Sequence, residues 1–247
     1  MGYNLRDACQ RYRNSEEINL FWGIITGQIE ELVYYHQMKS ISQLLQYLIR
    51  MKVYFSSRHS LTSSPEARKA IVSEPNSPAQ ARLSLVSMKS RLSLVPQYNP
   101  VLTTDQFLEA LKLFYPMKTA AQIDELFASA QRDLQYPSQF IEFQYLFLED
   151  DEGRLGEFLS TLIKQIRDEK LAYVEQIKQI LIGYPLITVS QFCRTIYMID
   201  PKIPRDELHR YIQWVFSIKD FHSSEHIKPL DLEDLLRRLE NCACFKH

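Results

Sequence analysis

The sequence predicts an all-α protein in which two similar helical segments flank one long central helix. From Leu155 to Leu181, apolar residues recur three, four and seven positions apart, which is the spacing of one face of a helix. Gly183 and Pro185 then stop this pattern. The segments on either side, 101–148 and 186–239, resemble each other along their whole length. The central helix and the repeat around it therefore define the fold class.

The first part of the chain, residues 1–55, predicts a helical hairpin. Two apolar stripes with helical spacing lie between residues 16 and 54. Their members are Ile18, Phe21, Trp22, Ile25, Ile29, Leu32 and Val33 in the first, and Ile41, Leu44, Leu45, Leu48, Ile49 and Val53 in the second. Gly23 and Gly27 have the spacing of a close-packed helix face, which in a soluble helix indicates tight packing.

Residues 56–100 have the composition of a disordered, basic linker. Serine, proline, alanine and arginine dominate, and six basic against two acidic residues give a net charge of +4, while the whole chain carries -1. Candidate phosphorylation sites are two serines before proline and two that follow arginine, namely Ser64, Ser77, Ser84 and Ser93. Phosphorylation would reverse the local charge and switch binding to an acidic surface. The alternative is an unregulated loop insertion.

Each copy of the repeat contains the same helix-start signal. The first copy, assigned to 101–148, opens with Thr103 and Gln106, and the second, assigned to 184–241, opens with Thr188 and Gln191. In such a capping box the threonine accepts a first-turn N–H while the glutamine bonds back to the cap residue. Each copy then continues through a helix, a proline-marked break, a second helix, a loop and a final short helix. That order of elements is the order of a paired EF-hand.

Calcium ligands do not accompany this order. A calcium-binding loop needs oxygen ligands at its first, third and fifth positions, glycine at its sixth and glutamate at its twelfth. With Leu102 and Ile187 in the eighth position, Gln106 and Gln191 fall in the twelfth, where a neutral amide cannot form the charged bidentate clamp. The sequence therefore predicts two degenerate EF-hand-like pairs without working calcium sites.

The closest match to a calcium loop is 220–231. It places Asp220 first, Ser224 fifth, Ile227 eighth and Asp231 twelfth, but it lacks the glycine and most of the carboxylates. Weak calcium binding at Asp220, Ser224 and Asp231 is the alternative hypothesis for this loop. A calorimetric titration with calcium that shows no heat would exclude it.

An acidic run opens the segment 149–183 that contains the central helix. Its members are Glu149, Asp150, Asp151 and Glu152. The simplest interpretation is a solvated helix N-terminus, where the helix dipole favours negative charge. As a functional interpretation, these four carboxylates form a candidate docking site for a basic partner.

Other chemistries have little support in the sequence. No glycine-rich phosphate loop occurs among the six glycines, and the four cysteines lack framework spacing, which is typical of a reducing cytosol. Cys242, Cys244 and His247 lie at the chain end, where fraying is expected. The apolar run 18–29 is too short for a membrane span, and the basic linker lacks the interleaved aromatics of nucleic-acid binding. We therefore expect no enzyme activity, no cofactor, no metal, no membrane partner and no nucleic acid.

Several strings in the chain resemble the translin-associated factor X-interacting proteins, specifically their C-terminal half. The most specific of them are 146–153, Asp168 to Lys170, 102–107 and Ile199 to Pro201. The resemblance covers nearly all of the chain except the linker, as a short homologue or isoform would. It implies a non-catalytic scaffold or adaptor of spermatogenesis or cilia that binds translin-associated factor X. It also implies a cytoplasmic, perinuclear, ciliary or flagellar location, and it supplies no catalytic or ligand residues.

Two further interpretations stay open. One is an axonemal or microtubule-associated structural protein with tubulin or axonemal proteins as partners, and the other is a weak calcium-binding regulator. The family has an upstream coiled-coil half without counterpart in these 247 residues. If that half carries the partner contact, this chain does not bind translin-associated factor X.

Overall fold

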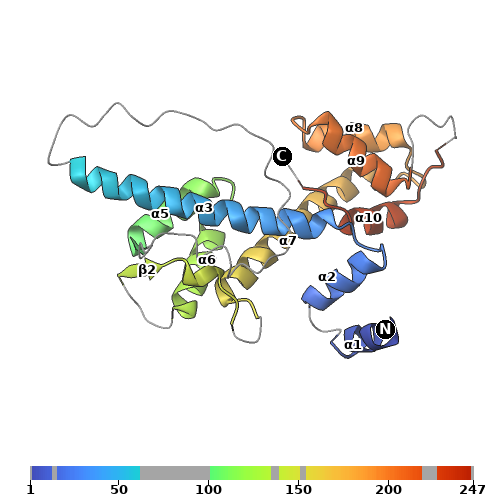
Figure 1. Ribbon diagram of the computed structural model, residues 1–247. Helices are drawn as coiled ribbons and strands as arrows, with labels where there is room; N and C mark the ends of the chain where they lie inside the picture. Colours follow the sequence, from blue (N-terminus) through green and yellow to red (C-terminus); the bar gives the residue numbers. More distant parts are fainter. Residues whose placement is uncertain are drawn as a thin grey trace. The chain divides into compact units, whose positions relative to one another are not determined.

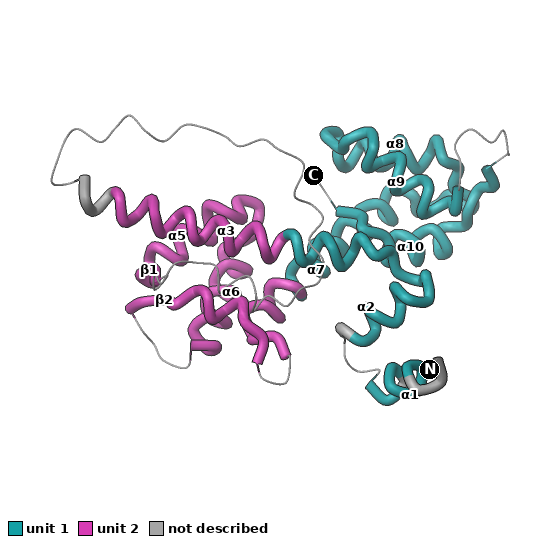
Figure 2. Tube along the Cα trace, viewed as in Figure 1, with its two compact units in different colours: residues 1–39, 164–247 teal, residues 40–163 magenta. Residues whose placement is uncertain are grey.

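The computed structural model describes residues 2–12, 16–61, 101–134, 139–150, 154–218 and 227–245. Within these ranges the chain is mainly helical, with one two-stranded antiparallel sheet (Figure 1). The prediction of a mainly helical protein is thus confirmed. Two compact units divide the chain, residues 1–39 with 164–247 forming unit 1 and residues 40–163 forming unit 2 (Figure 2). No helix in the described ranges has the length and apolar content needed to span a bilayer.

Unit 2 contains most of helix α3 (Leu32–Leu61), a set of short elements and the start of α7 (Glu157–Leu181). The short elements are β1 (Val101–Thr103), α5 (Thr104–Phe114), α6 (Ala120–Asp133), β2 (Phe140–Glu142) and the 3₁₀ turn η2 (Tyr145–Phe147). β1 pairs antiparallel with β2, and Leu102 lies opposite Ile141 at the centre of the pairing. Side chains directly opposite each other in an antiparallel pair lie on the same face of the sheet, and both of these side chains are buried.

One face of α3 contributes to the core of unit 2. Ile41, Leu44, Leu48 and Phe55 are buried at helical spacing. The helix runs to Leu61, whereas the sequence predicted its end near residue 54 and a linker from residue 56. Ser57 explains part of this difference, since its hydroxyl donates to the Val53 carbonyl at 2.9 Å and so is satisfied within the helix. The rest of the predicted linker, 62–100, lies outside the described residues.

Aromatic rings fill the centre of unit 2. Phe107 of α5 lies 6.5 Å from Phe127 of α6 and 6.1 Å from Phe158 of α7, measured between ring centroids. Phe158 also meets Phe147 edge to face at 5.7 Å. Such tilted and edge-to-face pairs add stabilisation beyond the area they bury. These rings tie α5, α6, η2 and the first turn of α7 together.

The first turn of α7 is fixed by a carboxylate from the end of α6. The two oxygens of Asp133 accept the amides of Glu157 at 2.7 Å and Phe158 at 2.8 Å, and Arg132 pairs with Glu157. A Cβ at Gly156 would come within 2.6 Å of the Asp133 Oδ2, so a glycine is needed there. This external cap makes α7 begin at residue 157. The acidic run before it is not the start of that helix, and the interpretation of the run as a helix N-terminus is wrong.

Unit 1 contains the rest of α7 and a second group of helices. They are α1 (Gly2–Arg11), α2 (Glu16–Ile25), the first turns of α3, α8 (Val189–Ile199), α9 (Arg205–Val215) and α10 (Leu232–Glu240). Their buried side chains form one cluster that includes Tyr173 of α7, Phe192 of α8, Tyr211 of α9 and Leu235 of α10. Gly183 has a φ of +100° just after the last residue of α7, so the helix ends where Gly183 was predicted to stop it.

In unit 1, as in unit 2, a capped helix begins directly after a residue in antiparallel pairing. Ile187 and Leu230 form an antiparallel bridge with N···O distances of 2.7 and 3.0 Å. Thr188 follows Ile187 directly and caps α8 through a full capping box with Gln191. The predicted box at Thr103 is also present, and Thr119 forms a further box with Gln122 at the start of α6. In each unit, therefore, a paired extended residue is followed at once by a capped helix.

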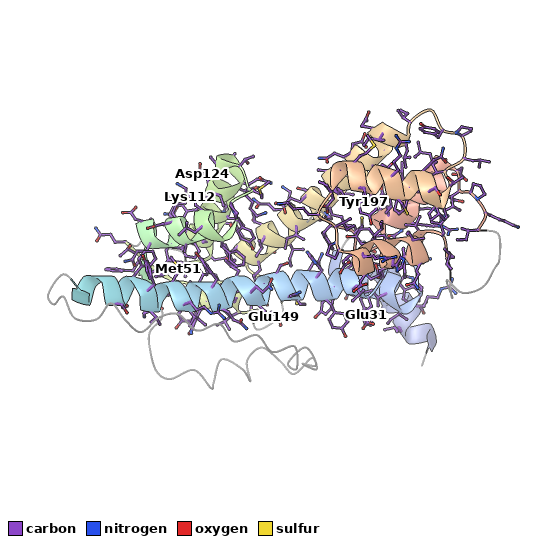
Figure 3. The ribbon with its side chains drawn as sticks, turned by 90° about the horizontal axis from the view of Figure 1, so that it is seen from above. Glu31, Met51, Lys112, Asp124, Glu149 and Tyr197 are labelled. Carbon is purple, nitrogen blue, oxygen red and sulfur yellow. The ribbon has the colours of Figure 1, made fainter. Side chains whose placement is uncertain are left out.

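We expect replacement of Asp133 by alanine to lower the free energy of unfolding by about 1–2 kcal/mol, since two amides of α7 would lose their acceptor. Chemical denaturation followed by circular dichroism measures this change. Asp124→Ala, on the exposed side of α6, is the matched control and should stay within about 0.5 kcal/mol (Figure 3). Equal effects of the two substitutions would contradict the capping role.

Candidate interaction and polar sites

Most residues predicted as sites from the sequence lie outside the described part of the chain. These are the calcium candidates Asp220 and Ser224, the serines Ser64, Ser77, Ser84 and Ser93, and Asp151 and Glu152 of the acidic run. Asp231, Glu149 and Asp150 are described.

Asp231 acts as a helix cap. Its Oδ1 accepts the amide of Asp234 at 2.8 Å, at the start of α10. Leu230, which directly precedes Asp231, forms the bridge to Ile187, whereas the calcium alignment placed Ile227 in the eighth position. Among the described residues no group of three or more His, Cys, Asp or Glu side chains could hold a metal ion. Weak calcium binding in this loop stays a prediction.

The glutamines in the clamp position bond to their own helix. The Oε1 of Gln106 accepts the amide of Thr103 at 3.1 Å, and the Oε1 of Gln191 accepts the amide of Thr188 at 2.9 Å. Each glutamine oxygen thus satisfies a backbone donor at the helix start. The two glutamines therefore have a helix-capping role, and their side-chain oxygens point toward the cap residue.

The described part of the acidic run forms a tight turn before α7. Glu149 bridges to Leu155, the amide of Asp150 donates to the Arg154 carbonyl at 2.9 Å, and the amide of Arg154 donates to the Asp150 Oδ1 at 2.7 Å. Glu149 and Asp150 are exposed. Their carboxylates remain candidates for docking a basic partner, on a turn rather than on a helix end.

Residues 242–244 are buried, contrary to the fraying expected near the chain end, and His247 lies outside the described residues. Cys242 and Cys244 have no exposed surface, and Ala243 between them is also buried. All four cysteines are free thiols, and these two belong to the core cluster of unit 1. We call residues 241–245 the strap. The reason for its burial is a set of long-range hydrogen bonds that composition cannot reveal.

The central interaction of the strap is a buried ion pair. Glu30, which precedes α3, accepts two bonds from the Arg210 Nη1 of α9 at 2.9 and 3.0 Å. The same carboxylate accepts the amide of Ala243 at 2.6 Å, while Arg210 Nη2 donates to the Ala243 carbonyl at 2.7 Å. Arg210 also pairs with Glu207. Both charges and the strap backbone are therefore satisfied by one another.

Further side chains hold the two ends of the strap. Lys170 of α7 donates to the Glu240 carbonyl at 2.6 Å, at the end of α10. The hydroxyl of Tyr211 accepts the Phe245 amide and donates to the Phe245 carbonyl, both at 3.1 Å. The ring of Phe245 stacks on His36 with centroids 3.7 Å apart. The strap is thus fixed to α3, α7 and α9 within unit 1.

Burial shifts several titrating groups around the strap. It raises the pKa of the Cys244 thiol to about 12, and it raises the pKa values of Cys242 and Tyr211. It lowers the pKa of Lys170, although nearby groups partly oppose this. For Arg210, burial alone would lower the pKa, but the hydrogen bond to Glu207 and the charge of Glu30 raise it above its usual value. The thiols are therefore protonated at neutral pH and are poor nucleophiles.

One feature of the sequence indicated the buried polar network around the strap. Lys170 falls between Ile166 and Tyr173 on the apolar stripe of α7, and a charge on such a stripe needs a buried partner. Glu30 and Arg210 gave no signal, because 180 positions separate them. Cys193 is half-buried against the unit 1 cluster, and burial raises its pKa.

Several large apolar side chains are exposed in the described residues. In unit 2 they include Leu113, Met117, Phe140 and Tyr145, and in unit 1 they include Ile182, Tyr184, Leu186, Tyr197 and Met198. Tyr197 lies on α8 (Figure 3). Scattered apolar residues are normal on a protein surface, whereas a contiguous apolar patch is typical of a contact site.

The chain is similar to curated proteins named Translin-associated factor X-interacting protein 1. It is 26% identical to the Mus musculus protein over 219 residues, which is 87% of this chain and 25% of that protein. It is 23% identical to the Homo sapiens protein over 227 residues, which is 90% of this chain and 28% of that protein. The resemblance predicted from the sequence is thereby confirmed, and the chain spans about a quarter of the length of these relatives. No family model and no solved structure matches the chain.

Replacement of Glu30 by glutamine should destabilise unit 1 by about 3 kcal/mol, because it leaves Arg210 without its buried charge partner. Urea denaturation gives the free energy of unfolding. The control is Arg237→Gln, which breaks only an exposed pair with Asp234 and should cost less than about 1 kcal/mol. The double variant E30Q/R210M should recover part of the loss, since no buried charge is left unpaired and only the partly exposed Glu207 loses its partner. No recovery would contradict the coupling.

The stability of unit 1 should fall by about 1–2 kcal/mol between pH 8 and pH 10. Unfolded thiols ionise near pH 9, whereas the folded Cys244 thiol keeps its proton to about pH 12, so ionisation favours the unfolded chain. Lys170 acts in the opposite direction, because its lowered pKa releases a proton from the folded state first. Urea denaturation at both pH values measures the net fall. It should be smaller in the variant C242A/C244A, and an equal fall would show that these thiols do not cause it.

Proposed function

We propose that this chain is a non-catalytic protein-interaction scaffold or adaptor built from two degenerate EF-hand-like pairs. In unit 2 the pair would consist of α3, β1, α5, α6, β2 and η2, and in unit 1 of α7 to α10. The antiparallel pairings Leu102 with Ile141 and Ile187 with Leu230 support this assignment, since EF-hand loops pair in this way. These assignments include α3 and α7 as first helices, which the boundaries 101–148 and 184–241 left out.

One observation carries the functional part of the proposal. At Gln106 and Gln191 the clamp position is a neutral amide that bonds to its own helix cap, so the fold keeps the helical pair without the metal chemistry. Helical pairs of this kind bind apolar and amphipathic segments of other proteins. The exposed apolar side chains of both units agree with such a role.

The proposed partner is translin-associated factor X or a similar protein. The name of the curated relatives states this interaction for them, and similarity over about nine-tenths of the chain supports extending it to this chain. We further propose a cytoplasmic, perinuclear, ciliary or flagellar location and a role in spermatogenesis or cilia. The acidic turn at Glu149 and Asp150 is the proposed contact for a basic surface of the partner.

The test is binding of purified translin-associated factor X to the immobilised 1–247 chain at low and high salt. We expect saturable binding that weakens with salt and falls about tenfold in Glu149→Lys, because an acidic contact would become basic. Glu233→Lys, on the exposed side of α10, is the matched control and should bind as the wild type does.

The absence of binding would overturn the proposed partner. Co-sedimentation of the chain with microtubules in both low and high salt would then favour the axonemal structural function. Heat on titration with calcium would instead favour the calcium-binding regulator. Equal loss in E149K and E233K would show that binding does not use the acidic turn.

A further inference from the structure

The strap is recognised through its backbone by side chains from other elements. Glu30 accepts the Ala243 amide and Arg210 donates to the Ala243 carbonyl. Tyr211 bonds to both the amide and the carbonyl of Phe245. In addition, the amide of Glu30 donates to the Asn241 carbonyl at 2.8 Å. The Cys242 amide donates to the Leu239 carbonyl at 3.1 Å, and the Cys244 amide donates to the Cys242 carbonyl at 2.8 Å. The strap is thus a turned segment whose residues 241, 243 and 245 bond to other elements.

Most buried backbone groups in this chain are paired within helices or between strands. At Ala243 and Phe245 the strap instead obtains its partners from a carboxylate, a guanidinium and a hydroxyl that lie in the turn before α3 and on α9. These groups recognise main-chain atoms, so they accept any residue with a free N–H and C=O at those positions. Proline at position 243 would remove one donor and leave part of the Glu30 carboxylate unpaired.

The side-chain positions of the strap add selectivity. Cys242 and Cys244 are fully buried in the cluster of unit 1, so the strap places small side chains at both of these positions. Phe245 stacks on His36, and its ring lies 5.9 Å from the Lys170 ammonium. The chain leaves α10 and passes beside α7 and the start of α3, as the contacts of Lys170 and His36 require (Figure 1). The site therefore combines backbone recognition with a pattern of small residues followed by an aromatic ring.

We propose that Glu30, His36, Lys170, Arg210 and Tyr211 form a peptide-recognition groove whose resident occupant is the chain's own strap. The strap blocks the groove until it is displaced, and a segment that replaces it carries small residues at the places of Cys242 and Cys244 and an aromatic residue at the place of Phe245. The biological meaning of this groove rests on the proposed interaction function, which it deepens by naming the chemistry of the segment recognised. The groove itself is defined by contacts within unit 1.

A labelled peptide of residues 239–245 tests the groove on the full chain by fluorescence anisotropy. The wild-type chain should bind it at least tenfold more weakly than the variant A243P, because the attached strap competes at a high effective concentration and the proline weakens that strap. A control peptide that carries the same proline should not bind. His36→Ala in the A243P background should reduce binding at least tenfold, whereas His209→Ala, exposed on α9, should not change it.

A folded A243P chain that binds the peptide no better than the wild type would overturn the proposal. So would a wild-type dimer that the peptide dissociates, because the occupant would then come from a second copy. If A243P does not fold, hydrogen exchange on the wild-type chain tests whether the strap can be displaced. Exchange of the Ala243 and Phe245 amides while α7 and α9 stay protected supports a displaceable strap, and exchange only with global unfolding overturns it. Translin-associated factor X takes no part, so failure here leaves the proposed partner untouched.

Discussion

The arrangement of both units depends on one local constraint, the side-chain cap that follows directly on a paired extended residue. Leu102, Ile187 and Leu230 use their backbone groups in antiparallel pairing, and the next residues, Thr103, Thr188 and Asp231, cap the helix that begins there. Because the pairing and the cap involve adjacent residues, the direction in which the helix leaves the pairing is fixed within one turn. The buried faces of α5, α8 and α10 are then oriented toward the core without further information from the loops.

The same constraint explains how a helical pair of this kind can persist without a metal ion. In a calcium-binding loop the residue at the third helical position supplies the bidentate carboxylate, which the ion holds in place. In the proposed EF-hand-like pairs that residue is glutamine in two of the loops, and its oxygen accepts the amide of the cap residue. The hydrogen bond satisfies a donor that would otherwise need water or a ligand at every helix start. Positioning of the exiting helix is therefore built into the chain itself, whatever occupies the loops.

These helix caps are also the part of the structure that could be predicted from the sequence. Apolar spacing and the Thr-x-x-Gln boxes depend on residues at most a few positions apart, so a single sequence reveals them. The start of α7 and the burial of the strap depend instead on Asp133 and on Glu30, which act on residues 24 and 213 positions away. A run of carboxylates looks like a helix start, and a short segment near the chain end looks frayed, until the distant partner is known. Lys170 is the exception, because a charge on an apolar stripe can be noticed in the sequence.

The Glu30 and Arg210 pair is better explained by specificity than by net stability. A buried ion pair is often no more stabilising than apolar residues of the same shape, since the loss of hydration offsets the attraction. An apolar pair at these positions would also bury the strap, but it would leave the amide and carbonyl of Ala243 without partners. The charged pair satisfies both groups at one position of the strap and no other, so it sets the register of the segment. A groove that fixes register through main-chain atoms can accept another segment of matching shape, whereas a purely apolar contact would hold either segment loosely.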